Sequence, residues 1–155
     1  MKKLIKSFGY AINGIITTVK SERNMRIHTA FLFYVAAGGF IAQFSLTEWV
    51  SALLCIALVI GMEFINTALE RMCDEVQKGY SENIKKAKDA AAGGVLVCAV
   101  ISAVIGSALF LRREKLEIIW NFICENTIIF AVLVLLLPIW LVFIFRESKK
   151  EDKKK

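Results

Sequence analysis

The sequence predicts an all-α integral membrane helical bundle, and three observations support this prediction. Hydrophobic residues make up 57% of the chain and proline occurs once, whereas the apolar fraction of soluble domains is about 45–50%. Four apolar blocks recur, each close to the roughly 20 residues that a helix needs to cross the hydrocarbon core. They cover residues 29–46, 49–69, 90–111 and 126–145. Cationic side chains flank the blocks, as in membrane proteins with a fixed orientation.

Before the first block, residues 4–19 carry the pattern of an amphipathic helix. Leu4, Phe8, Ile12 and Ile15 recur at spacings of three and four, which is typical of a helix lying in the membrane interface. We therefore expect an N-terminal interfacial amphipathic helix, three core transmembrane helices and a fourth. From the pattern alone, a simple positively charged anchor explains this segment equally well.

The distribution of lysine and arginine predicts the orientation of the helices. Six lie in residues 1–28, five in 71–89, three in 112–125 and six in 146–155, with none in the short turn at 45–48. Because cytoplasmic loops are rich in Lys and Arg, four crossings place the N-terminus, the middle loop and the C-terminus in the cytoplasm. This flanking pattern also explains the net charge of +6, so we expect no nucleic-acid partner.

The composition divides the chain into three parts. Residues 1–111 form the core, residues 112–145 a connecting segment and the additional transmembrane helix, and residues 146–155 a basic cytoplasmic tail. Clusters of small residues at 36–39 and 90–94 indicate close helix contacts. Three or four helices enclose little space, so we expect a sizeable site to be completed between protomers.

A stripe of polar side chains lies at the end of the second block. Glu63, Asn66, Glu70 and Asp74 stand at offsets 0, 3, 7 and 11, which places them within roughly 80° on one face of a helix. An ionisable group at membrane depth costs at least about 2.5 kcal/mol on insertion scales, which makes Glu63 a candidate functional residue. Carboxylates that only pair with cations to hold helices together would not need to stack on one line.

Two more acidic residues and a lysine complete a possible phosphate site. Glu22 precedes the first block, and Asp89 follows Lys88 where the third helix is expected to begin. Free N–H groups at a helix N-terminus favour an anion, as does the charge of Lys88. A row of carboxylates needs a cation, and oxygen ligands without a His or Cys cluster favour magnesium. These are the components of phosphoryl transfer.

At these residues the chain resembles the prokaryotic diacylglycerol kinase family, which includes the undecaprenol kinases of Gram-positive bacteria. The matching segments are Phe8-Gly-Tyr-Ala with Asn13-Gly14, Glu22-Arg-Asn-Met-Arg-Ile-His-Thr-Ala30, Glu63-Phe-Ile-Asn-Thr-Ala-Leu-Glu70 with Asp74, and Ala87-Lys-Asp-Ala-Ala-Ala-Gly-Gly94. The resemblance covers about residues 6–111. It implies a homotrimer in a bacterial plasma membrane, with ATP- and Mg²⁺-dependent sites between protomers that face the cytoplasm.

The resemblance also implies a role for each matching position. Glu63 corresponds to the general base that takes the proton of a lipid hydroxyl, and Glu22 and Glu70 correspond to ligands of the Mg²⁺ that bridges the ATP phosphates. Asn66 and Asp74 are expected to line the same cavity. The positions expected to bind ATP are Tyr10, Glu22, Glu70, Gly79, Tyr80, Ser81, Lys88 and Asp89.

Two departures from the family pattern affect these expectations. Ala92, a candidate lipid-binding position, stands where Gram-negative diacylglycerol kinases carry a serine, and with the Glu22 segment it favours undecaprenol as the lipid alcohol. Diacylglycerol is the alternative substrate. The family core usually ends after three crossings, whereas residues 126–145 form a fourth block without an ionisable side chain. We therefore expect a chain truncated after Arg113 to keep its activity.

Two functions of other classes also fit the residues alone. A small proton-coupled transporter would use Glu63 as a proton carrier, but it would not need the polar set at the membrane boundary. A purely structural membrane subunit would show neither activity. Magnesium- and lipid-dependent ATP consumption separates a kinase from both.

Overall fold

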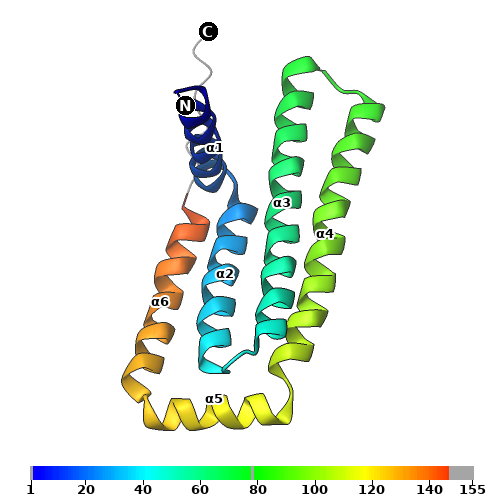
Figure 1. Cartoon of the computed structure of the whole chain (residues 1–155). Coiled ribbons are helices and arrows are strands. Elements are labelled where there is room, and N and C mark those ends of the chain that lie inside the picture. Colours follow the sequence, from blue (N-terminus) through cyan, green and yellow to red (C-terminus); the bar gives the residue numbers. More distant parts are fainter. Residues whose placement is uncertain (1, 78, 147–155) are drawn as a thin grey trace.

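The computed structural model describes residues 2–77 and 79–146, and every element within these ranges is an α-helix. The helices are α1 (Lys2–Ser21), α2 (Arg23–Ile41), α3 (Leu46–Val76), α4 (Glu82–Phe110), α5 (Arg113–Glu125) and α6 (Thr127–Phe145) (Figure 1). The structure thus confirms the predicted all-α class. Residues 147–155, which hold most of the predicted basic tail, lie outside the described residues.

Three of the described helices are long and apolar enough to cross a membrane, namely α3, α4 and α6. They contain the second predicted block and all but one residue each of the third and fourth. The first block was placed too late, because α2 runs from Arg23 to Ile41 and not over residues 29–46. Its first turns hold Arg26 and His28, which lower its hydropathy, so α2 is not among the three. Figure 1 shows α2 beside α6, and its crossing stays a prediction.

The helices α3 and α4 form a long antiparallel hairpin (Figure 1). They approach closely at Gly94, where an added Cβ would lie 2.7 Å from Cε of Met62. The helices α2 and α3 also approach closely, at Gly39 of α2, where an added Cβ would lie 2.8 Å from the Trp49 ring of α3. Both glycines belong to the small-residue clusters of the sequence, so the prediction that these clusters mark helix contacts is confirmed.

The loop between α3 and α4 is shorter than the sequence indicated. We expected the third helix to begin near Asp89, but α4 begins at Glu82. The physical reason is that residues 82–90 consist mainly of Glu, Lys and Ala, which are strong helix formers and extend the helix beyond the apolar block. Lys88 therefore lies in the second turn of α4, away from the free N–H groups of its N-terminus.

The connecting segment forms a further helix, α5, which lies across the end of the bundle opposite α1 (Figure 1). Its Lys115 is only 5% exposed. The Lys115 ammonium pairs with Glu48 at 3.1 Å and donates to the carbonyls of Ala42 and Gln43, each at 3.2 Å. Glu48 also pairs with Arg112 and closes a capping box with Ser45. This ion cluster fixes α5 to the turn between α2 and α3.

We expect Lys115→Met to destabilise the protein by about 3 kcal/mol, because it removes one partner of a buried ion pair. The thermal unfolding midpoint of the full chain in detergent measures the effect. The matched control is Lys86→Met, which breaks an exposed pair with Glu82 that is worth roughly 0.5 kcal/mol. Equal midpoints for the two variants would show that the buried cluster adds no stability.

The N-terminal helix α1 presents its apolar side chains outward. Leu4, Ile5 and Phe8 are 63%, 69% and 62% exposed, and α1 packs only on α2 among its stronger helix contacts. The structure therefore shows a helix at Lys2–Ser21, while its amphipathic character as a membrane-surface helix stays a prediction.

Candidate active site

The buried carboxylate of the predicted stripe is the centre of the site. Glu63 lies on α3 and is 2% exposed, and its Oε2 atom has no hydrogen-bond partner within the described part of the chain. Glu22 and Glu70 lie close enough for their charges to act on Glu63, and the side chain of Asn24 reaches it. A buried acceptor without a partner costs free energy, so such an atom marks a place where a proton donor can bind.

The rest of the stripe follows the same face of α3 toward its end. Asn66 is 6% exposed and donates through Nδ2 to Oε1 of Glu70 at 3.0 Å, while its Oδ1 has no partner in the described chain. Glu70 is half-buried and Asp74 is exposed. The stripe therefore runs from buried side chains to an exposed one along α3, and its depth in the membrane stays a prediction.

Glu22 joins the site from the junction between α1 and α2. Its Oε1 accepts a hydrogen bond from Ser21 at 3.0 Å and pairs with Arg71 at 3.3 Å. Arg71 also donates to the Ser21 hydroxyl. Sequence reasoning considered such a cation only as a structural partner of the carboxylates. The available signal that Arg71 lies at the site was its position directly after Glu70.

Lys88 connects α4 to the same end of α3. Its ammonium pairs with the carboxylate of Asp74, so the structure brings together two of the predicted site residues from different helices. Asp89 is exposed on the next position of α4.

The remaining predicted positions are more open to solvent in the single chain. Tyr10 on α1 and Tyr80 in the loop between α3 and α4 are 75% and 82% exposed. Gly79 is exposed, Ser81 is half-buried, and Ala92 is exposed on α4. The structure does not place these five positions against Glu63.

Within residues 2–77 and 79–146, no three His, Cys, Asp or Glu side chains are arranged to hold a metal by themselves. Magnesium is commonly bound by one or two carboxylates together with substrate phosphates. Glu22, at the junction between α1 and α2, and Glu70, on α3, are the two carboxylates whose charges act on Glu63, and their role as metal ligands stays a prediction.

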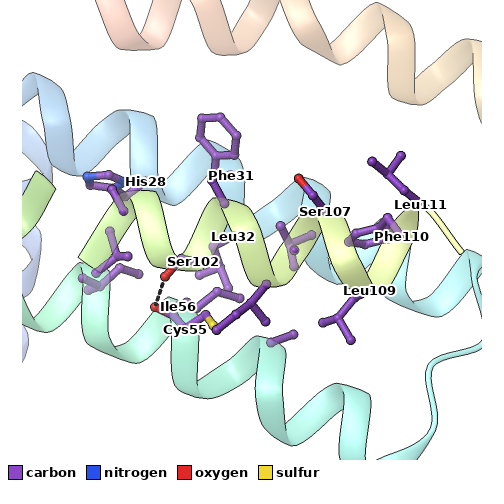
Figure 2. Close-up of a pocket in the computed structure, with 18 residues that line it drawn as sticks. His28, Phe31, Leu32, Cys55, Ile56, Ser102, Ser107, Leu109, Phe110 and Leu111 are labelled. Atoms are coloured by element: carbon purple, nitrogen blue, oxygen red, sulfur yellow. Dashed lines mark hydrogen bonds between the residues drawn. The ribbon is translucent and has the colours of Figure 1, made fainter. Parts of the chain in front are cut away.

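An apolar cavity begins about one helical turn from Glu63. It has a volume of 510 Å³ and lies between α2, α3 and α4. Figure 2 shows His28 near one end and Leu111 near the other, with Ser102 donating to the Cys55 carbonyl inside. Ile60 lines it three residues before Glu63. Sequence reasoning did not find this cavity, because its small and aliphatic lining residues are indistinguishable from helix-packing residues.

Fold and site together define an integral membrane helical protein with an acidic site beside a hydrocarbon-lined cavity. The chain belongs to the prokaryotic diacylglycerol kinase family, whose sequence model matches residues 9–110. It is therefore a lipid kinase, a phosphotransferase that acts on a lipid alcohol, and the family resemblance noted in the sequence is confirmed.

Two relatives extend this assignment. The chain is 40% identical to an undecaprenol kinase of Bacillus subtilis over 113 residues, which cover 73% of this chain and 92% of the relative. It is 36% identical to a diacylglycerol kinase of Synechocystis over 109 residues, which cover 70% of this chain and 62% of that relative. No solved structure matches.

Proposed function

We propose that the protein is an undecaprenol kinase, which transfers a phosphoryl group from ATP to the hydroxyl of a polyprenol. The observation that carries this proposal is the buried, unpartnered Oε2 of Glu63 beside an apolar cavity. The similarity to the Bacillus subtilis undecaprenol kinase over 92% of its length supports the polyprenol as substrate. The site and the N-terminus face the cytoplasm in this proposal.

In the proposed reaction, Glu63 is the general base. Its free Oε2 accepts the proton of the lipid hydroxyl as the hydroxyl oxygen bonds to the terminal phosphorus of ATP. The bond from that phosphorus to the bridging oxygen breaks, and ADP leaves. Positioning and charge neutralisation supply most of the rate in phosphoryl transfer. Asn24 and Asn66 keep the carboxylate cluster oriented through their amides.

The other charged residues hold the nucleotide. Glu22 and Glu70 would hold Mg²⁺, which neutralises charge on the phosphate oxygens when bound. Lys88 exchanges its contact with Asp74 for a phosphate oxygen, and Asp89 lies beside it on α4. We assign the remaining nucleotide contacts to Tyr10 and to the loop at 79–81.

The exposed nucleotide positions are consistent with a homotrimer. A second copy that packs beside α3 and α4 would cover residues that one chain leaves open, including Tyr80 and Ala92. In this arrangement the hydrocarbon chain of the lipid enters the cavity between α2, α3 and α4 and extends past Ala92 between protomers.

Diacylglycerol is the second candidate substrate, because the Synechocystis relative is a diacylglycerol kinase. The transporter considered from the residues alone is set aside, since family membership makes the chain an enzyme.

Supplied with both lipids at equal concentration, the full chain is expected to phosphorylate undecaprenol with a kcat/KM at least about tenfold above that for diacylglycerol, a difference of about 1.4 kcal/mol. Labelled ATP, Mg²⁺ and mixed lipid vesicles followed by identification of the labelled product measure this ratio. A reversed ratio would assign the protein as a diacylglycerol kinase, and no labelled lipid would overturn the proposed site.

A further inference from the structure

The carboxyl end of α6 is attached to α2 by a buried guanidinium. Arg26 is 4% exposed, and its Nη1 donates to the carbonyls of Phe143 at 3.0 Å and Arg146 at 2.7 Å. The guanidinium also lies 6.0 Å from the centre of the Phe143 ring. Arg26 therefore contacts the backbone and a side chain at the end of the additional helix.

Helix chemistry explains why a cation belongs at this place. The last carbonyls of a helix have no intrahelical donor and carry the negative end of the helix dipole. The Val142 carbonyl accepts from the Arg146 N–H at 2.9 Å, which leaves the Phe143 carbonyl for Arg26. The planar guanidinium presents several donors at fixed angles, so one group can satisfy two carbonyls.

The same turn of α2 carries two groups of the site. The Arg26 N–H donates to the Glu22 carbonyl at 3.3 Å, and Asn24 between them reaches Glu63. A second contact fixes the register of the two helices, because the Tyr34 hydroxyl donates to the Leu133 carbonyl at 3.1 Å. Pro138 has no N–H to donate to the carbonyl of residue 134. One helical hydrogen bond of α6 is therefore missing directly after the Leu133 carbonyl.

We infer that Arg26 is a positioning residue through which the end of α6 holds the Glu22 segment in its metal-binding place. This inference rests on the proposed function, since it assigns Glu22 to Mg²⁺. It replaces our expectation from the sequence that residues 126–145 are dispensable for activity. The region that matches the family ends at residue 110, so α6 adds to the site a support from outside the shared core.

The full chain in lipid vesicles tests the inference through the KM for MgATP. Arg26→Gln is expected to raise this KM about tenfold, because it removes a charged donor to two carbonyls, and to change the KM for the lipid less than about twofold. Arg26→Lys keeps a cation and should recover part of the loss. Phe143→Ala should raise the same KM by a smaller factor. The double variant should be no worse than Arg26→Gln, because both changes break one contact.

Val142→Ala is the matched control, since Val142 is the neighbouring residue of α6 and is 72% exposed. Amide hydrogen exchange over residues 22–26 gives a second measurement that needs no activity. Exchange should accelerate in Phe143→Ala and stay unchanged in Val142→Ala. This measurement does not depend on whether the Arg26→Gln variant assembles.

An unchanged KM for MgATP in Arg26→Gln, or equal exchange in the two α6 variants, would overturn the inference. If the unchanged protein phosphorylates no lipid, the proposed function is overturned. If amide exchange over residues 22–26 still accelerates in Phe143→Ala and not in Val142→Ala, the contact between α2 and α6 is retained.

Discussion

Glu63→Gln is expected to lower kcat for lipid phosphorylation by about 10²- to 10⁴-fold, which is the usual contribution of a general base. Glutamine has nearly the same shape as glutamate but cannot take the hydroxyl proton. The measurement is the initial rate of phosphoryl transfer from labelled ATP to undecaprenol at saturating substrates.

The KM for MgATP in Glu63→Gln should stay within a few-fold of the parent value, because the change removes a group that acts in the chemical step. Glu75→Gln is the matched control, since Glu75 is exposed on the same helix. A Glu63→Gln enzyme that retains a rate close to that of the Glu75→Gln enzyme would exclude Glu63 as the base.

Glu22→Gln and Glu70→Gln are expected to raise the Mg²⁺ concentration for half-maximal rate at least about tenfold, a lower bound taken from changes around metal ligands. Each variant removes one charged oxygen and leaves the other carboxylate near Glu63 in place. High Mg²⁺ should therefore restore part of the rate. Magnesium titrations at fixed ATP measure the shift.

The control for these titrations is Glu82→Gln, which removes an exposed carboxylate from the first turn of α4. If all three variants need the same Mg²⁺ concentration for half-maximal rate as the unchanged protein, Glu22 and Glu70 do not bind the metal. If only Glu70→Gln shifts, the Glu22 carboxylate serves to hold Ser21 and Arg71, with which it is already bonded.

The polar stripe on one face of α3 could be predicted because it depends on local periodicity. A residue spacing of 3, 7 and 11 places side chains on one helix face wherever the helix lies, and the apolar residues before Glu63 indicate its depth. Lys88 does lie beside Asp74, but it was expected at the start of the helix and lies in its second turn, since the start of α4 depends on whether polar helix formers extend the helix beyond the apolar block.

Two buried cations that join helices could not be predicted, because they depend on partners without a sequence signature. Arg26 and Lys115 both donate to backbone carbonyls, and every residue supplies such a group. Neither cation could be distinguished in the sequence from a solvated flanking charge. Tyr10 and Tyr80 are exposed in the single chain, and the nucleotide and second copy that we propose to cover them are separate molecules.

The contact between α2 and α6 also bears on the order in which the chain folds during synthesis. Arg26 is separated from its two acceptors by 117 and 120 residues, and the intervening α3 and α4 hairpin forms contacts much nearer in sequence. Contacts with large sequence separation form late, and the N-terminal part of a chain leaves the ribosome first. The Arg26 contact must therefore form after α6 has been synthesised, so a ribosome that stalls before residue 143 leaves the first turns of α2 without it.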